Sequence, residues 1–224
     1  MQIKHLGCAD YVATWHAMRA FTAQRDAGTE DELWLVQHPP VFTLGQAGRP
    51  AHLLAANGIP VVATDRGGQI TYHGPGQVVA YALLDLRRLG IYVKELVFRI
   101  EQSVIQTLGA FGVEGRRVGG APGVFVPCIS CAPPPFTGLA KIAALGVRVT
   151  GGCCYHGVAL NVAMDLAPYS QIDPCGHPGL PVVDLAMLGV DTDCDAVGHA
   201  LSKRLQAHLS ARAQPRAEAR IAAL

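Results

Sequence analysis

The chain has 224 residues, half of them hydrophobic, which is enough to bury the core of one large domain. Its 18 basic and 17 acidic side chains give a net charge of +1, which argues against a nucleic-acid binder that works through bulk charge. No run of 18 apolar residues and no signal-peptide pattern are present, so we expect no membrane span. Seven cysteines, an odd number without the density of a disulfide scaffold, indicate a reduced, cytoplasmic protein.

The first part of the chain predicts one helix followed by strands. Residues 10–27 carry apolar side chains at helical spacing, with Asp10 as a suitable N-cap and Gly28 as a stop. The segment ELWLVQHPPVFTLG (32–45) indicates a strand, a double-proline break and a second strand, and IPVVATD (59–65) indicates another short strand. The apolar run VVAYALLDL (78–86) is typical of a strand that is buried on both faces.

The second part predicts two more helices and further strands. Residues 92–111 place one apolar stripe at helical spacing, and a last helix begins at Asp193 or Asp195. We expect a turn and a strand over 115–126, a proline-rich loop over 127–138, two short strands about Leu145–Gly146 within 139–152, and a strand over 153–162. Strands outnumber helices and do not alternate with them, which favours an α+β fold with a mixed sheet. We expect one domain over 1–213 and a frayed tail over 214–224.

The segment DRGGQITYHGPGQVVAY (65–81) combines glycines with strand-forming residues. Glycine permits positive φ and lets a backbone approach a ligand closely. We therefore interpret the segment as a bent strand pair beside a bound molecule, with a glycine-rich β-hairpin as the alternative. The sequence YHG stands within this stretch at 72–74 and recurs at 155–157, so the two turns are candidates for facing walls of a pocket.

Cys175 stands in a proline- and glycine-rich loop, IDPCGHPG. A free thiol is mostly protonated at neutral pH, so a nucleophilic cysteine needs a helper. His177 is close in sequence, and His73 or His156 could be brought close by the fold. Lys141, in GLAKIAALG, is another candidate base, because burial would disfavour its ammonium form. The alternative for Lys141 is a side chain that reaches from a strand end to water.

The remaining cysteines offer a weaker metal hypothesis. Cys128 and Cys131 form a CxxC pair and Cys153 and Cys154 are adjacent, so four thiols could bind structural zinc. Adjacent residues rarely both face one tetrahedral ion, and the CxxC pair neither opens a helix nor follows a strand. We favour incidental cysteines and expect no metal site.

Four blocks in this order, RGGQITYHGPGQVVAY, GLAKIAALGVRV, YHGVALNV and IDPCGHPGL, resemble the lipoyl(octanoyl) transferase family, also called the lipoate-protein ligase B type, over residues 32 to 180. The resemblance implies the mixed-sheet fold of biotin and lipoate protein ligase catalytic domains. It implies transfer of an octanoyl group from acyl carrier protein to a lysine of lipoyl domains, in 2-oxoacid dehydrogenase complexes and the glycine cleavage H protein. It also implies no ATP, no metal and no other cofactor, and neither nucleic-acid nor membrane partners.

The resemblance places the family nucleophile on Cys175 and the lysine that activates it on Lys141, which decides the helper question against His177. The residues matching the family's substrate-contacting segments are Arg66, Gly67, Gly68, Gln69, Ile70, Thr71, Tyr72, His73, Ala144, Leu145, Gly146, Gly157, Val158 and Ala159.

In the implied mechanism Cys175 carries the octanoyl group as a thioester and Lys141 moves protons. Backbone N–H groups near Cys175, with His73 or His156, would stabilise the oxyanion. The proline-rich segment 127–138 and the pair Cys153–Cys154 depart from the family pattern without touching the Cys175 and Lys141 positions.

Two other functions stay open at this point. An ATP-dependent lipoate or biotin protein ligase would share the fold, but it needs no catalytic cysteine, and the sequence has no P-loop. A non-enzymatic zinc or lipid-carrier module would make Cys175 and Lys141 dispensable.

Overall fold

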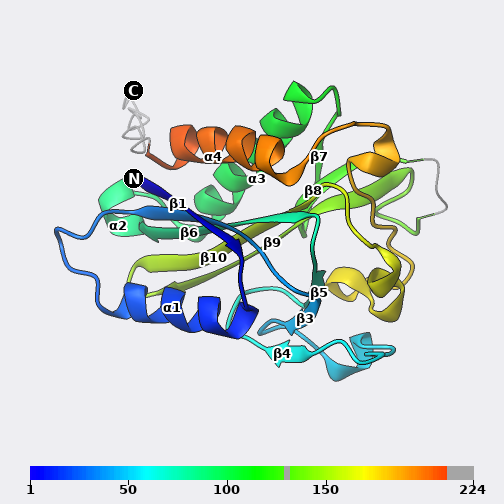
Figure 1. The fold of residues 1–224 in the computed structure, drawn as a ribbon, viewed down its shortest axis with the longest axis horizontal. Helices are drawn as coiled ribbons and strands as arrows, with labels where there is room; N and C mark the ends of the chain where they lie inside the picture. Colours follow the sequence, from blue (N-terminus) through cyan, green and yellow to red (C-terminus); the bar gives the residue numbers. More distant parts are fainter. Residues whose placement is uncertain (129–131, 211–224) are drawn as a thin grey trace, which may run out of the picture.

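A seven-stranded mixed sheet runs through the centre of the computed structural model, which describes residues 1–128 and 132–210 (Figure 1). Its first two strands are parallel and the other neighbours are antiparallel. The order across the sheet is β1 (Gln2–Cys8), β2 (Glu32–Gln37), β6 (Gln77–Asp85), β10 (Cys153–Asn161), β9 (Leu139–Thr150), β8 (Ala121–Pro127) and β7 (Arg116–Val118). The predicted α+β class with a mixed sheet is confirmed.

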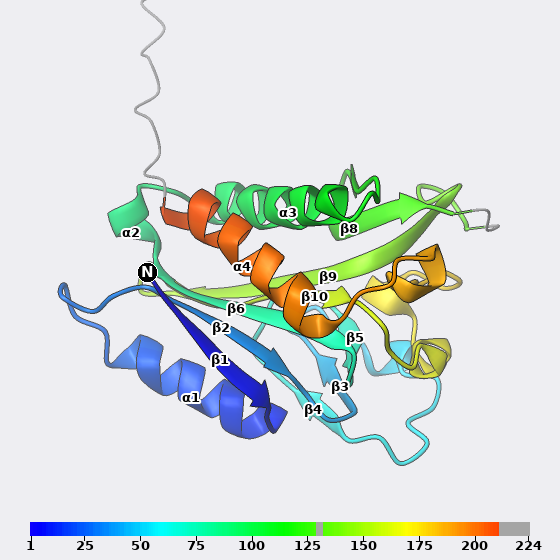
Figure 2. The same cartoon turned by 45° about the horizontal axis from the view of Figure 1, so that its top comes forward.

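Helices α3 (Val93–Ala110) and α4 (Cys194–Ser210) cover one face of this sheet, and the short α2 (Leu86–Leu89) follows β6 (Figures 1 and 2). Buried residues of α3, such as Leu96, Ile100 and Val104, pack with alternate residues of the central strands into the largest core. The side chain of Asp193 accepts a hydrogen bond from the Ala196 N–H, so this aspartate caps α4 as one of the two predicted caps. Both helices match their predicted positions.

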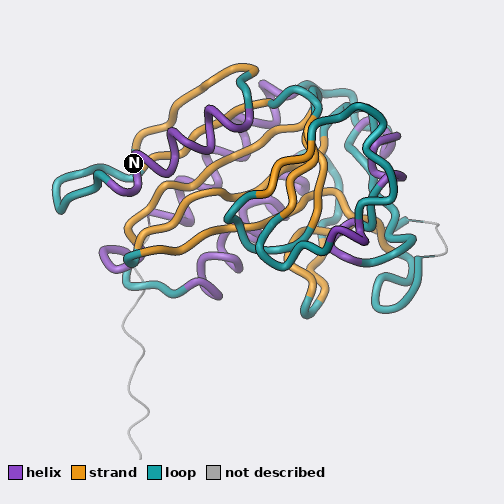
Figure 3. Tube along the Cα trace, turned by 90° about the horizontal axis from the view of Figure 1, so that it is seen from below, coloured by secondary structure: helices purple, strands orange, loops and turns teal. Residues whose placement is uncertain are grey.

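The other face is shared between α1 (Tyr11–Ala23) and a small three-stranded sheet of β4 (Val61–Ala63), β3 (Val41–Leu44) and β5 (Ile70–His73). Seen from below, α1 and the small sheet lie over different parts of the large sheet (Figure 3). The side chain of Asp10 caps α1 by accepting from the Ala13 N–H, as predicted, but the helix ends at Ala23 rather than near Gly28.

Strand β6 is buried on both faces, as its apolar run predicts. Val78, Ala80 and Ala82 belong to the core under α3 and α4, whereas Val79 and Tyr81 belong to the core under α1. Alternate side chains of one strand therefore serve opposite layers.

One strand was missed, and two predictions about strands are wrong. The edge strand β1 was not predicted, because six of its seven residues are exposed and show no apolar alternation. Residues 139–150 form one continuous strand, β9, because Gly146 stays in the strand and leaves room for the chain crossing at Gly67; a Cβ on Gly146 would lie 2.5 Å from the Gly67 carbonyl oxygen. Strands β5 and β6 are not a pair: they follow each other in the chain but belong to different sheets.

A β-bulge interrupts β9 near its start. Val124 pairs with Ala143 while Phe125 pairs with Lys141, so Ile142 is the extra residue. Ile142 and Ala143 consequently both face the large core. With strict alternation from Ala143, Lys141 would point into that core; the bulge turns it to the opposite face.

Residues 129–131 of the proline-rich segment and the chain from 211 onward lie outside the described residues, and the tail predicted over 214–224 lies there with them. Within the described ranges, no helix is both long and apolar enough to cross a membrane.

Candidate active site

Lys141 and Cys175 meet although they are far apart in sequence. The Lys141 Nζ donates a hydrogen bond to the Cys175 Sγ at 2.7 Å and another to the Pro122 carbonyl at 3.0 Å. The lysine is only 3% exposed, and its Nζ lies 5.2 Å from the centre of the Phe125 ring. The hypothesis of a lysine that reaches out to water is therefore wrong.

The Cys175 loop is attached to the strand that carries Lys141. The Lys141 N–H donates to the Pro181 carbonyl at 2.8 Å, and the Val183 N–H donates to the Lys141 carbonyl at 3.0 Å. Val182 thus takes the place beside β9 that β10 occupies further along. Cys175 itself has a φ of 55°, a conformation uncommon outside glycine, which presents its thiol from a tight turn.

A glycine gives the lysine its space. Gly123 on β8 has a φ of +128°, and a Cβ there would lie 3.0 Å from the Lys141 Nζ and 2.5 Å from the Ala143 carbonyl oxygen. The Gly123 N–H donates at 3.0 Å to the carboxylate of Glu101 on α3, whose other oxygen lies 2.9 Å from the Arg117 Nε. The bulge turns Lys141 toward the thiol, and Gly123 leaves room for its end.

A pocket with about 470 Å³ of empty space, open solvent included, extends from Cys175 between the large sheet and β5. All the residues predicted to contact substrate line it except Gly67 and Tyr72. The Gly67 N–H donates to the Val147 carbonyl at 3.0 Å, which holds the RGG loop across β9. Tyr72 points the other way, into a separate core with Phe42 and Tyr169. These two positions depart from the expectation because side chains alternate along β5 and the loop closes over β9.

The floor of the pocket is built in rows by the strand register. Ala144, Ala159 and Val79 are partners across β9, β10 and β6. In the next row stand Gly146, Gly157 and Tyr81. Small side chains thus form the part of the floor nearer to Lys141, and a tyrosine begins the far part.

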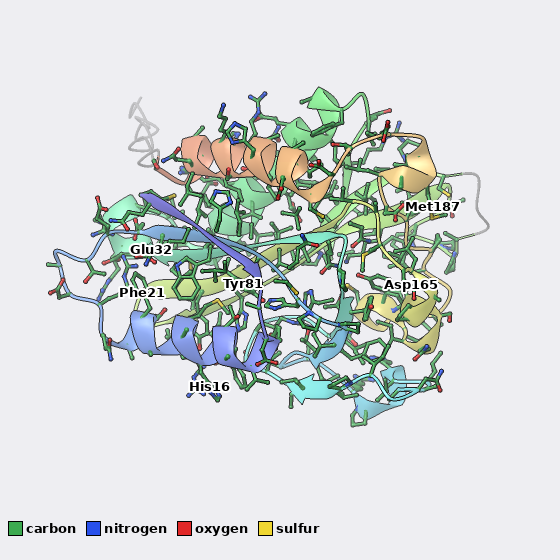
Figure 4. The ribbon with its side chains drawn as sticks, in the orientation of Figure 1. His16, Phe21, Glu32, Tyr81, Asp165 and Met187 are labelled. Carbon is green, nitrogen blue, oxygen red and sulfur yellow. The ribbon has the colours of Figure 1, made fainter. Side chains whose placement is uncertain are left out.

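Sequence reasoning missed Tyr11, Val79 and Tyr81 as pocket residues. Val79 and Tyr81 share a face of β6, and period-two alternation predicts that they share a face but not which one. Tyr11 begins α1 and has no local signal. Tyr81 lies between the sheet and α1, whereas His16 points away on the outer side of that helix (Figure 4).

The three histidines considered as helpers do not hydrogen-bond to the thiol. His177 packs edge-on against Phe136, with ring centres 4.8 Å apart. The His73 Nδ1 donates to the Gln77 Oε1 at 2.7 Å, and burial lowers the pKa of His73 to about 3, so this ring is neutral. His156 lies 3.0 Å from Asp65, and burial lowers the pKa of His156 as well.

Arg66 is buried in the pocket wall and braces the small sheet. Its guanidinium donates to the Thr43 hydroxyl at 2.8 Å and to the Gln69 carbonyl at 2.7 Å. Burial lowers the pKa of Arg66, although an arginine stays charged at neutral pH.

The zinc hypothesis finds no support among the described residues, where no group of three or more His, Cys, Asp or Glu side chains is placed to hold a metal ion. Cys154 is buried in the large core, and its thiol donates to the Ala82 carbonyl at 3.3 Å. Cys131 lies outside the described residues.

The fold is that of lipoate and biotin protein ligase catalytic domains. A bipartite lipoate protein ligase from Thermoplasma acidophilum superposes with a TM-score of 0.72 at 16% identity, over 95% of this chain and 84% of that one. A lipoate-protein ligase A solved with ATP gives 0.71 at 16% identity, over 95% and 87% of the two chains. Biotin protein ligase from Aquifex aeolicus gives 0.53 at 11% identity, over 94% and 69%.

Sequence comparison narrows this class. Residues 10–206 match the lipoyl protein ligase A/B catalytic domain. An octanoyltransferase from Methylibium petroleiphilum is 56% identical over 94% of this chain and 99% of its own length. An octanoyltransferase from Paraburkholderia phytofirmans is 57% identical over 97% and 91% of the two chains. The chain belongs to the octanoyltransferases of this family, which confirms the resemblance seen in the four sequence blocks.

Proposed function

We propose that the chain moves an octanoyl group from the phosphopantetheine of an acyl carrier protein to a lysine of a lipoyl domain, through a thioester on Cys175. The 2.7 Å contact between the Lys141 Nζ and the Cys175 Sγ carries the proposal, because it pairs a nucleophile with a group that can move its proton. The octanoyl part of the reaction is supported by relatives at 53–57% identity that are octanoyltransferases.

In the first half of the reaction Lys141, as the neutral amine, takes the thiol proton, and the Cys175 sulfur attacks the carbonyl carbon of the donor thioester. A carbon–sulfur bond forms, and the carbonyl electron pair moves to oxygen. When the intermediate collapses, the bond to the phosphopantetheine sulfur breaks. That sulfur takes the proton back from Lys141 and leaves as a thiol, so atoms and charges balance.

In the second half the neutral amine of the acceptor lysine attacks the thioester on Cys175. Lys141 takes one proton from the attacking nitrogen and returns it to the departing Cys175 sulfur, which restores both groups. The two reactive side chains therefore serve both halves. One thioester is exchanged for another before the amide forms, so we propose that the reaction needs neither ATP nor a metal.

The acyl chain occupies the pocket beside Cys175. The row of Ala144, Ala159 and Val79 and the glycines of the next row form an apolar floor. At about 0.8 kcal/mol per buried methylene, seven carbons beyond the carbonyl supply several kcal/mol of binding. The neutral His73 lies in the wall, so the site does not place an imidazolium charge against the chain.

The ATP-dependent ligase is the second candidate, since the fold admits it. The cysteine in contact with Lys141 favours the transferase, because a ligase that activates a free acid needs no such thiol. We also propose that the acceptors are the lipoyl domains of 2-oxoacid dehydrogenase complexes and the glycine cleavage H protein. The free thiols of Cys8, Cys153, Cys154 and Cys175 support action in a reducing compartment, the cytoplasm.

The proposal is tested by incubating the protein with octanoyl-carrier protein in the absence of ATP and measuring its intact mass. We expect one octanoyl adduct on the wild type, mapped to Cys175, which then transfers to an added lipoyl domain. The Cys175→Ser variant should show neither event. An adduct that persists in that variant, or a requirement for ATP, would contradict the proposal.

A further inference from the structure

His156 lies at the end of the pocket that is farthest from Lys141. Along β9 and β10 the pairs run Ala144 with Ala159, Leu145 with Val158, Gly146 with Gly157, and then Val147 with His156. Lys141 and Val147 are six residues apart and the bulge at Ile142 takes up one step, so at about 3.3 Å per strand residue they are separated by roughly 16 Å. The lysine and cysteine side chains bridge part of this length. With carbon–carbon bonds of about 1.5 Å, an extended eight-carbon chain covers roughly 10 Å.

The conformation of His156 is unfavourable, and it faces a carboxylate. Its φ is 64°, a value that non-glycine residues rarely adopt. This backbone lets two successive side chains, those of Tyr155 and His156, both hydrogen-bond to Asp65. The Trp15 indole N–H donates to the same carboxylate at 2.8 Å. Strain that persists in a packed strand is held there by its surroundings and is frequent at functional positions.

The ring is also left with an unpartnered atom. Burial lowers the pKa of His156, and in the neutral ring that donates from Nε2 to Asp65 at 3.0 Å the Nδ1 is an acceptor; it is buried with no hydrogen-bond partner. A strained backbone and a buried acceptor without a partner both cost stability. If His156 served only for packing, another residue at this position would make the fold more stable. Trp15, Tyr155 and His156 all donate to the Asp65 carboxylate, and these bonds fix the position of the His156 ring.

A second cavity lies behind the His156–Asp65 pair. Asp65 and Tyr155 line a groove with about 1470 Å³ of empty space, open solvent included. Four arginines line it too, from α1, the turn after α1, α2 and β9: Arg19, Arg25, Arg87 and Arg148. His156 lines the acyl pocket, and Asp65 lines the groove. The His156–Asp65 hydrogen bond therefore joins the linings of the two cavities.

We propose that His156, fixed by Asp65, is the stop that sets the length of the acyl chain by closing the pocket against the arginine-lined groove. The inference rests on the proposed acyl transfer through Cys175. A chain of eight carbons ends before the imidazole and Tyr81, whose rings stand 6.0 Å apart. Longer chains meet a fixed polar ring and cannot pass it into the groove.

The test is a competition between octanoyl- and dodecanoyl-carrier protein for loading onto Cys175, read by intact mass. His156→Gly removes the ring and also accepts the positive φ, so it relieves strain while opening the wall. We expect the dodecanoyl-to-octanoyl ratio to rise at least tenfold, because the added methylenes no longer collide with the ring and can pass toward the groove. His156→Asn, smaller and tolerant of positive φ, should shift the ratio in the same direction. Arg148→Ala, which changes the groove but not the wall, should leave it unchanged.

A wild-type measurement completes the test. An octanoyl chain with a photoreactive diazirine at its last carbon, loaded onto Cys175, should label Tyr81 or His156. Labelling elsewhere, or an unchanged chain-length ratio in variants that still load octanoyl groups, overturns the stop and leaves the proposed acyl transfer standing. Failure of the wild type to load any chain on Cys175 overturns the proposed function itself, and the stop with it.

Discussion

Gly123→Ala should separate Lys141 from Cys175 without altering either residue. Gly123 has a φ of +128°, where an alanine is strained by roughly 1–3 kcal/mol. The new Cβ would lie 2.5 Å from the Ala143 carbonyl oxygen and 3.0 Å from both Cε and Nζ of Lys141. The carbonyl belongs to the paired strand β9 and moves only with it, whereas the lysine end can shift by rotation about its side-chain bonds, at the cost of its hydrogen bonds to Cys175 and Pro122. We therefore expect the ammonium to be displaced.

The present contact is 2.7 Å and a sulfur accepts hydrogen bonds at longer range than an oxygen, so a shift of about 1.5 Å is needed to take the Nζ out of hydrogen-bond range of the sulfur. Positioned acid–base groups contribute about 10²- to 10⁴-fold to rates. We expect Gly123→Ala to slow octanoyl loading of Cys175 by about 10- to 100-fold, as measured by quenched intact-mass time courses. The strain should also lower Tm by several degrees, since 1 kcal/mol corresponds to about 2–4 °C in a chain of this size.

Gly119→Ala is the matched control. Gly119 stands just before the same strand, its φ is not in the left-handed region, and a Cβ there would meet no atom within 4 Å. We expect wild-type loading and an unchanged Tm. If Gly123→Ala loads at the wild-type rate while its Tm falls, the glycine serves folding alone and the reasoning about Lys141 is refuted.

Three further predictions concern buried groups. Lys141→Met keeps the side-chain length and should slow loading at least 100-fold without loss of folding; wild-type rates in protein that urea titration shows to be folded would contradict the role of the Lys141 amino group. Unfolded His73 takes up a proton near pH 6.5, whereas folded His73 stays neutral down to about pH 3, so the free energy of unfolding should fall as pH drops below about 6.5. Urea titrations should show a loss approaching 1.4 kcal/mol per pH unit from this group, and His73→Asn should flatten the slope. Burial raises the pKa of Cys154 to about 12, so iodoacetamide should label the exposed Cys8 long before Cys154, and equal labelling of both in folded protein would contradict the structure.

Asp65 should further lower the free energy of unfolding in acid, in a lower pH range than His73. Burial alone would raise its pKa, but hydrogen bonds from His156, Tyr155 and Trp15 hold the pKa of Asp65 well below its usual range. The unfolded carboxylate takes up a proton near pH 4 while the folded one remains charged, so stability falls as pH drops below about 4. Asp65→Asn should remove that part of the pH dependence in urea titrations, and an identical acid limb in the two proteins would contradict it.

Sequence patterns located the helices and the buried strands because each carries its own signal. The stripe of α3 and the apolar run of β6 depend only on periodicity, and both are where the patterns place them. The edge strand β1 carries no apolar signal because it buries little. Pairing was the harder question: β5 and β6 look like two arms of one hairpin, and only long-range contacts decide that they belong to different sheets.

At the site, it was easier to predict which residues take part than to predict which face of a strand each side chain occupies. The family resemblance singled out Lys141 and Cys175, and the structure brings them into contact. Alternation along β9 would have placed Lys141 in the core, because the bulge at Ile142 depends on the register of β8 and is invisible in a single strand. Tyr72 was expected in the pocket and faces away, since its neighbours on β5 take the pocket side.

The attachment of the Cys175 loop to β9 bears on the lifetime of the proposed acyl-enzyme intermediate. The proposed reaction involves two partner proteins in turn, and the thioester must outlast the interval between their visits. Swinging the loop outward would break the bonds from Lys141 N–H to Pro181 and from Val183 N–H to Lys141, and would leave the main chain of β9 without partners at that point. Opening of the loop therefore requires that these two hydrogen bonds to β9 break. The main chain of Lys141 thus anchors the loop that carries Cys175, and the side chain of the same residue is the one that moves protons in the proposed mechanism.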